Sequence, residues 1–126
     1  MKQVLVIEDN RDNLGLIRFA LERAGYKVTS AETGAAGVSV ALESSFDLII
    51  VDINLPDFDG YEVTRRIRKA SPDKAAPIVA ITSNAMTGDR EKTLAAGCDG
   101  YFEKPIDPIT IVEQIEKAVG ISRATK

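Results

Sequence analysis

Five polar side chains that can take part in chemistry directly follow short hydrophobic runs of the chain. They are Glu8 and Asp9 after VLVI, Asp52 after LIIV, Thr82 after IVAI, and Lys104 after YFE. If these runs are strands of one parallel sheet, their carboxyl ends lie along one edge, where open sheets of this kind bind ligands. The sequence therefore predicts a single site that gathers three carboxylates, a hydroxyl and an amine.

The predicted carboxylate cluster favours a divalent cation. Carboxylates that lie close together repel one another, so either their pKa values rise or a hard cation neutralises them. Oxygen ligands in a chain without histidine favour Mg²⁺, with Mn²⁺ as a substitute, over Zn²⁺. The simpler alternative is that Glu8 and Asp9 only cap the next helix. That alternative leaves the positions of Asp52 and Lys104 unexplained.

A cation, a lysine and a hydroxyl around carboxylates would form an electrostatic clamp for a phosphoryl group in transfer. Asp52 would be the nucleophile and form an acyl phosphate, while the metal screens the charges that repel the donor. Lys104 would supply positive charge. Thr82 would donate a hydrogen bond to a phosphoryl oxygen, although threonine at a strand end is also ordinary packing.

The elements that must position these residues follow from the hydrophobic pattern. Short apolar runs alternate with helix-spaced segments throughout the 126 residues, which predicts about five strands, five helices and a doubly wound parallel sheet of the α/β class. The runs VLVI and LIIV are apolar without alternation, as in central strands covered on both faces, and we expect them to be neighbours. Gly25, Gly97 and Gly120 are expected to end helices.

Length and composition limit the possible functions. A chain of 126 residues with a net charge of −3 suits one domain, which we predict over residues 1–120 with a short C-terminal tail at 121–126. Basic residues cluster on one predicted helix, but no aromatic residues interleave them, so we interpret them as a solvated face without a nucleic-acid partner. The cluster contains Arg65, Arg66, Arg68 and Lys69.

The single Cys98 cannot form an internal disulfide, and without any histidine it has no partner for a nucleophilic pair, so we interpret it as a structural thiol. No signal region and no segment of membrane length is visible. We therefore expect a cytoplasmic protein without a membrane partner.

Four segments in order closely resemble the receiver domain of two-component response regulators, of the single-domain chemotaxis and cell-division type. The segments are VLVIEDN, LIIVDINLPDFDG, IVAITSNAM and GCDGYFEKPID. The resemblance runs from Met1 to Gly120 and implies a flavodoxin-like fold with strand order 2-1-3-4-5. One departure is Glu8, where many members carry aspartate; the extra methylene still allows contact with a metal through water.

The resemblance implies a role for each residue of the predicted site. Asp52 would accept a phosphoryl group from a histidine kinase or a phosphotransfer protein in a phosphorelay. Asp9 and Asp52 would ligate Mg²⁺, Glu8 would help through water, and the backbone carbonyl of Asn54 would complete the metal site. Lys104 would bind the phosphoryl group. The protein would not be an enzyme beyond catalysing its own phosphorylation and dephosphorylation.

The resemblance also implies a switch made of Thr82 and Tyr101, which couples the site to the face of the fourth helix, fifth strand and fifth helix. Thr82 would move toward the phosphoryl group while Tyr101 turns inward. The output would be either docking of a downstream protein or onward relay of the phosphoryl group. The docking patch on that face would be formed by Asp89, Arg90, Lys92, Tyr101 and Glu103.

Other protein classes share some of these sequence features. A flavodoxin-like mononucleotide binder should have a glycine-rich or hydroxyl-rich loop after the first strand, whereas this loop reads EDNRDN. A phosphatase with an aspartate nucleophile should carry that nucleophile on the first strand and have a larger core. A phosphorylation-independent interaction module and a receiver excised from a hybrid kinase both stay open as alternatives.

Overall fold

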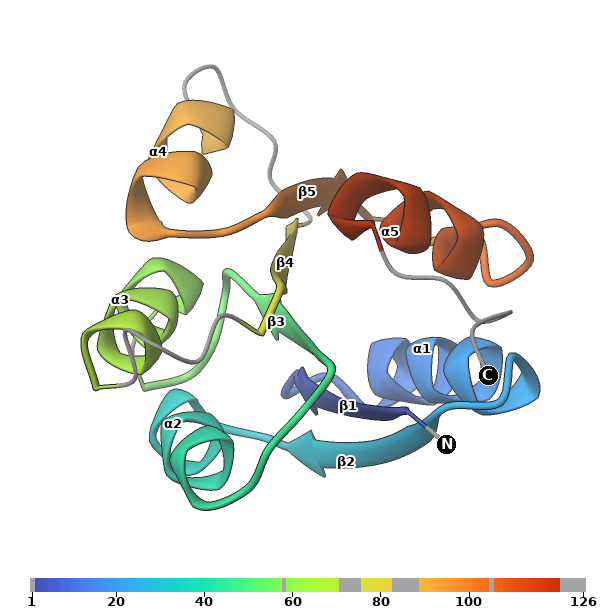
Figure 1. Ribbon diagram of the computed structural model, residues 1–126, viewed down its shortest axis with the longest axis horizontal. Helices are drawn as coiled ribbons and strands as arrows, with labels where there is room; N and C mark the ends of the chain where they lie inside the picture. Colours follow the sequence, from blue (N-terminus) through green and yellow to red (C-terminus); the bar gives the residue numbers. More distant parts are fainter. Residues whose placement is uncertain (1, 58, 71–75, 83–88, 105, 121–126) are drawn as a thin grey trace.

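The computed structural model describes residues 2–57, 59–70, 76–82, 89–104 and 106–120, in which strands and helices alternate. The predicted tail at 121–126 lies outside these residues. Figure 1 shows the elements, which are β1 (Gln3–Ile7), α1 (Arg11–Arg23), β2 (Lys27–Ala31), α2 (Gly34–Glu43), β3 (Leu48–Asp52), α3 (Gly60–Ala70), β4 (Ile78–Thr82), α4 (Asp89–Ala96), β5 (Gly100–Glu103) and α5 (Ile111–Val119).

The strands form one sheet in the order β2-β1-β3-β4-β5, and every neighbouring pair is parallel. In Figure 1, α1 and α5 lie on one side of this sheet, while α2, α3 and α4 lie on the other. The predicted fold class and strand order are confirmed. The strands β1 and β3 are neighbours, as their uninterrupted apolar sequences led us to expect.

The core lies in two layers because successive strand residues point to opposite faces of the sheet. On β1, Val4 and Val6 join a buried cluster with residues of α1 and α5. Leu5 and Ile7, which alternate with them, join a second cluster with residues of α3. All four side chains are fully buried. A strand covered on both faces needs apolar residues at every position, which explains the pattern of the sequence.

The glycines predicted to end helices have the left-handed backbone that this role requires. The φ angles are 96° at Gly25 after α1, 109° at Gly97 after α4 and 76° at Gly120 after α5. A side chain is strained in this conformation, and glycine is not.

In the described residues, no helix has the length and apolar character needed to cross a membrane.

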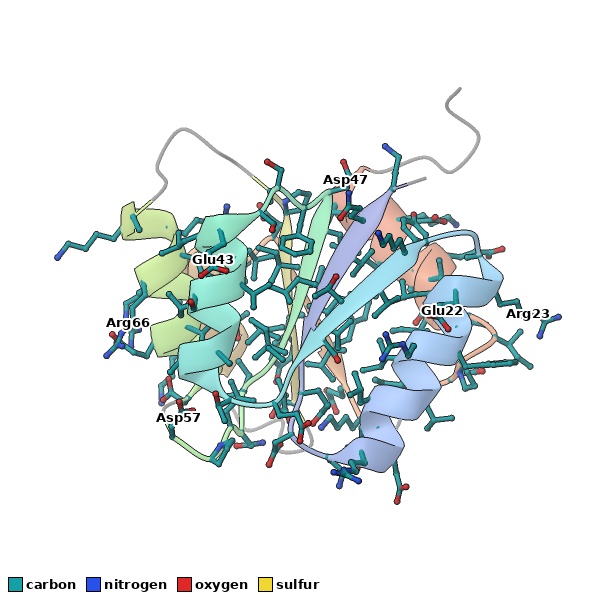
Figure 2. All side chains as sticks on the ribbon, turned by 90° about the horizontal axis from the view of Figure 1, so that it is seen from below. Glu22, Arg23, Glu43, Asp47, Asp57 and Arg66 are labelled. Atoms are coloured by element: carbon teal, nitrogen blue, oxygen red, sulfur yellow. The ribbon has the colours of Figure 1, made fainter. Side chains whose placement is uncertain are left out.

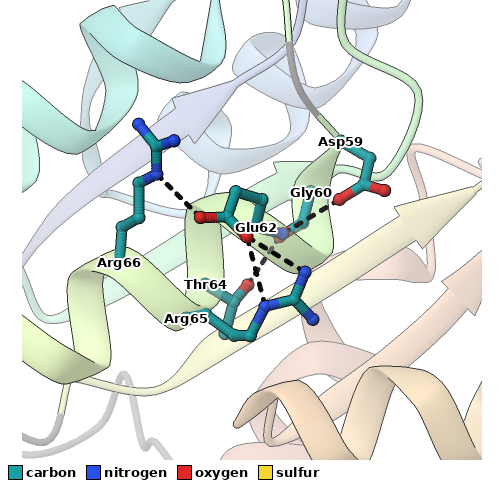
Figure 3. A network of polar contacts seen from close by, with 6 residues as sticks. All are labelled: Asp59, Gly60, Glu62, Thr64, Arg65 and Arg66. Atoms are coloured by element: carbon teal, nitrogen blue, oxygen red, sulfur yellow. Dashed lines mark hydrogen bonds and ion pairs between the residues drawn. The ribbon is translucent and has the colours of Figure 1, made fainter.

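The basic cluster on α3 is partly neutralised by a glutamate of the same helix (Figure 3). The carboxylate of Glu62 pairs with Arg65 at 3.1 Å and with Arg66 at 2.8 Å. Its backbone N–H donates to Asp59 Oδ1 at 2.9 Å, so Asp59 caps the start of α3. Arg65, Arg66 and Lys69 are exposed, which fits the interpretation of a solvated helix face. Arg68 departs from it, because it is half-buried and its guanidinium pairs with Asp99 at 2.8 Å.

Cys98 is a free, buried thiol beside the turn that leads into β5. Its Sγ lies 3.5 Å from the hydroxyl of Thr64 on α3. Burial raises the pKa of the Cys98 thiol, which keeps it protonated and unreactive at neutral pH. This geometry agrees with the structural role expected for it.

Candidate functional site

The carboxyl ends of four strands bring the predicted side chains to one edge of the sheet. Glu8 follows β1, Asp52 and Thr82 are the last residues of β3 and β4, and Lys104 follows β5. Carboxylate oxygens of Glu8, Asp9 and Asp52 all lie within 4.8 Å of one another. Residues that are distant in sequence therefore form one acidic cluster, as expected from the strand ends.

The ammonium group of Lys104 bridges two of the carboxylates. Lys104 Nζ lies 3.0 Å from Glu8 Oε1 and 3.1 Å from Asp52 Oδ2. The backbone aligns it, because the N–H of Lys104 donates to the carbonyl of Thr82 at 2.8 Å. Thr82 is buried, and it follows Ile81, which pairs in register with Asp52 on the neighbouring strand β3. The predicted lysine and hydroxyl thus lie at the same edge of the sheet as the acids.

Burial gives the cluster unusual electrostatics. Glu8 is 1% exposed and Asp52 3% exposed, whereas Asp9 is exposed to solvent. Burial, followed by the hydrogen bond and the charge of Asp52, raises the pKa of Glu8 to about 7, although Lys104 and the N–H of Asn10 oppose the shift. A buried carboxylate whose pKa lies near neutrality is held in its charged form at a cost.

The pKa of Lys104 is also raised, but here burial opposes the shift instead of causing it. Burial by itself lowers the pKa of its ammonium group, but the hydrogen bonds to Glu8 and Asp52 outweigh burial and the pKa lies above its ordinary value. Lys104 is therefore fully charged at neutral pH. One ammonium still faces three carboxylates, and an oxygen-binding divalent cation would remove that imbalance. The donor set thus fits the predicted Mg²⁺ site.

The alternative that Glu8 only caps α1 does not account for its contacts. The side chain that caps this helix is that of Asn10, whose Oδ1 accepts the N–H of Asn13 at 3.0 Å. Glu8 Oε2 accepts the N–H of Asn10 at 3.2 Å. Its other oxygen turns to Lys104 inside the site. Glu8 thus joins the start of α1 to the acidic cluster.

The loop after β3 folds back around Asp52. Asn54 lies in this loop, and its N–H donates to Asp52 Oδ1 at 3.0 Å. Further along, the N–H of Gly60 donates to the carbonyl of Ile53 at 2.9 Å, so α3 begins directly against the end of β3. A Cβ atom at Gly60 would lie only 2.6 Å from the carbonyl oxygen of Asp52. This close approach requires glycine.

Two residues near the site were not among the predicted site residues. The sequence predicts Gly60 only as a loop residue, although a glycine soon after an aspartate at a strand end is a visible signal of close backbone approach. Asp57 carried no signal at all. Its carboxylate accepts the backbone N–H groups of Gly34 and Ala35 at the start of α2, a helix distant in sequence.

The face around β5 has a hollow beside the predicted switch tyrosine. A cavity of about 490 Å³ is lined by Tyr101, Phe102, Glu103, Ile106, Asp107, Thr110, Ile111 and Gln114. Tyr101 is half-buried and packs against the cluster on the α3 side of the sheet. Lys92 and Glu103 of the predicted docking patch are exposed. The side chains of Asp89 and Arg90, also in that patch, lie outside what the structure describes.

Comparisons with known proteins agree on one family. The family profile described as "Response regulator receiver domain" matches residues 4–116. The polar-differentiation response regulator DivK of Brucella ovis is 35% identical over 119 residues, which cover 94% of this chain and 97% of DivK.

Solved structures show the same likeness. Chemotaxis protein CheY4 of Vibrio cholerae superposes with a TM-score of 0.87 at 29% identity, over 94% of this chain and 98% of that one. The receiver domain of the sensor histidine kinase PA1611 of Pseudomonas aeruginosa PAO1 superposes with a TM-score of 0.84 at 36% identity, with the same coverage. That structure contains a magnesium ion coordinated in its active site cleft.

Proposed function

The chain belongs to the response regulator receiver domain family, and from this membership we propose that Asp52 is the residue that accepts the phosphoryl group. The protein is a DivK- and CheY-like receiver of the phosphoaccepting two-component kind. One observation carries the assignment: Asp52 ends a central strand, buried, with its carboxylate beside those of Glu8 and Asp9 and the ammonium group of Lys104.

The residues proposed to hold Mg²⁺ are the carboxylates of Asp9 and Asp52, the backbone carbonyl of Asn54, and Glu8 through a water molecule. The cluster of oxygens and the magnesium ion in the PA1611 receiver support this set, and Mn²⁺ is proposed to substitute. When bound, the ion would neutralise the carboxylates and screen the negative charge of the incoming phosphoryl group.

The chain's own groups then account for the transfer. A carboxylate oxygen of Asp52 attacks phosphorus, the bond from phosphorus to the donor breaks, and the donor leaves with the electron pair. Before the transfer, the ammonium group of Lys104 pairs with Asp52. After it, the ammonium group moves to an oxygen of the phosphoryl group, because the negative charge now lies there and no longer on the carboxylate. The hydroxyl of Thr82 donates to a second phosphoryl oxygen. A histidine kinase or a phosphotransfer protein is the proposed donor.

The proposed output is docking of a downstream protein on the face of α4, β5 and α5. Phosphorylation shifts the equilibrium between two forms of this face only as far as the phosphoryl group interacts differently with them. Thr82 and Tyr101 are proposed to supply that difference. The hollow beside Tyr101 supports this choice, because side-chain rotation of a half-buried ring needs space next to it.

The expected cytoplasmic location stays a prediction, as does the domain boundary at residue 120.

The proposal is tested by incubating the protein with Mg²⁺ and acetyl phosphate and measuring its intact mass. One phosphoryl group that hydroxylamine removes is expected on the wild type. It should be absent from Asp52→Asn and from a sample treated with chelator. An adduct on Asp52→Asn would move the acceptor elsewhere. No adduct on the wild type would instead favour an interaction module that works without phosphorylation.

A further inference from the structure

Asp57 ties the loop that follows the acceptor strand to a helix elsewhere in the chain. Its Oδ1 accepts the backbone N–H of Gly34 at 2.7 Å, and its Oδ2 accepts that of Ala35 at 2.9 Å. Figure 2 shows Asp57 at the end of α2 opposite Glu43. Both carboxylate oxygens are thus used on the first turn of α2, where N–H groups lack partners within the helix and the helix dipole favours negative charge.

The helix that Asp57 holds is itself fixed against the strand that carries the acidic pair. A Cβ atom at Gly37 of α2 would lie 2.5 Å from Ile7 Cδ1, so the helix backbone rests directly on this side chain. Ile7 immediately precedes Glu8 and pairs in register with Val51, the residue before Asp52. The first turn of α2 therefore packs directly against the strands that carry the site.

The loop between Asp52 and Asp57 contains Asn54, the residue proposed to offer its carbonyl to Mg²⁺. One end of this loop is fixed by the sheet, and the N–H of Asn54 donates to Asp52 at 3.0 Å. Leu55 packs, half-buried, against the core cluster. At its far end the carboxylate of Asp57 provides the tie to α2. A short loop held at both ends has little freedom to turn its carbonyl groups.

We propose that Asp57 is a positioning residue, which holds the carbonyl of Asn54 toward the metal by clamping the loop to the start of α2. This inference rests on the Mg²⁺ site proposed above. Groups that orient metal ligands without touching the metal typically change its affinity by about 10- to 100-fold when they are removed.

The competing explanation is that Asp57 merely caps α2 and stabilises the fold. The chain offers a matched control, because Thr33 also caps this helix: its Oγ1 accepts the N–H of Ala36 at 3.1 Å. Thr33 is adjacent to α2 in sequence, however, and is not part of the loop after β3. Loss of either cap should weaken the start of α2, but only loss of Asp57 should release the loop.

The test compares wild type, Asp57→Ala, Asp57→Asn and Thr33→Ala by calorimetric titration with Mg²⁺, with urea unfolding to measure stability. We expect Asp57→Ala to bind Mg²⁺ roughly tenfold more weakly. Thr33→Ala should bind within about twofold of wild type, although both alanine variants lose stability. Asp57→Asn lacks the charge but keeps one oxygen acceptor, so it should bind with intermediate affinity.

Three results would overturn the inference. Equal losses of Mg²⁺ affinity in Thr33→Ala and Asp57→Ala would show that only the helix end matters. Equal losses in Asp57→Asn and Asp57→Ala would show that charge and not position matters. Unchanged affinity in Asp57→Ala, with wild type binding normally, would remove the role while leaving the metal site intact.

A second measurement separates this inference from the metal proposal, because it needs no metal. In the presence of chelator, amide hydrogen exchange at Asn54 reports directly on the loop. It should be about tenfold faster in Asp57→Ala than in Thr33→Ala, a difference that the same unfolding of α2 in both variants would not produce. Equal exchange rates in the two variants would sink the proposed clamp even if wild type binds Mg²⁺.

Discussion

The buried carboxylate of Glu8 should make the metal-free protein lose stability as the pH rises. Its pKa in the folded protein is about 7, against an ordinary value of 4.5. The folded state therefore binds this proton more tightly than the unfolded state. The contribution of Glu8 to the free energy of unfolding is then highest below pH 4.5, falls as the pH rises toward 7, and is constant above. This is the reverse of an ordinary ion-paired carboxylate.

The size of the effect follows from the shift. One pKa unit corresponds to about 1.4 kcal/mol, so a pKa near 7 in place of 4.5 costs on the order of 3 kcal/mol once Glu8 is fully ionised. We expect the whole of this free-energy cost, because the side chain of Glu8 is 1% exposed and solvent does not screen its charge. Glu8→Gln keeps the shape but has no proton to lose, so it should escape the penalty.

The assay is urea unfolding in chelator between pH 5.5 and 8, on wild type and Glu8→Gln. The chain contains no histidine, so no imidazole titrates in this range and the difference between the two proteins isolates Glu8. Wild type should lose on the order of 2 kcal/mol across the range relative to the variant, because the rest of the effect falls below pH 5.5. Glu32→Gln, at an exposed position, serves as the control and should follow wild type.

Saturating Mg²⁺ at pH 8 should restore the wild-type stability, because a bound cation favours the ionised carboxylates. Mg²⁺ should raise the free energy of unfolding by less in Glu8→Gln, because the variant site has less negative charge for the cation to neutralise. Parallel pH profiles of wild type and Glu8→Gln in chelator would refute the reasoning. They would mean that Lys104 compensates the carboxylate fully and that Glu8 is ionised at no cost.

Three further perturbations test other contacts. Lys104→Met leaves two buried carboxylates without their cation and should destabilise the metal-free protein by about 3 kcal/mol in urea unfolding, with saturating Mg²⁺ recovering part of the loss. Gly60→Ala places a methyl group 2.6 Å from the carbonyl oxygen of Asp52; it should cost about 1 to 3 kcal/mol and slow acetyl phosphate labelling, and an unchanged labelling rate would show that the strand end yields without harm. Tyr26→Phe removes the hydrogen bond from the Tyr26 hydroxyl to Glu116 on α5; it should lower the melting temperature and cost about 1 kcal/mol, and unaltered melting would mean that this contact adds nothing to the docking of α5.

Much of the fold was predictable because it follows from local periodicity. Uninterrupted apolar runs of strand length indicate a parallel sheet covered on both faces, and glycines after helix-spaced segments indicate where helices end. The site followed in turn. Parallel strands all end at the same edge of a sheet, so polar residues placed directly after several strands must meet there whatever lies between them.

The sequence by itself therefore determined the fold class and the gathering of Glu8, Asp9, Asp52 and Lys104, since both depend on patterns read along the chain. Only the tertiary structure decided how each group is held. Clustering of carboxylates indicated that pKa values could rise, but the dominance of burial at Glu8 and the two N–H partners of Asp57 have no local signature, because burial and hydrogen bonding depend on atoms that come from distant segments. An aspartate in a loop looks the same in sequence whether it faces solvent or clamps a helix.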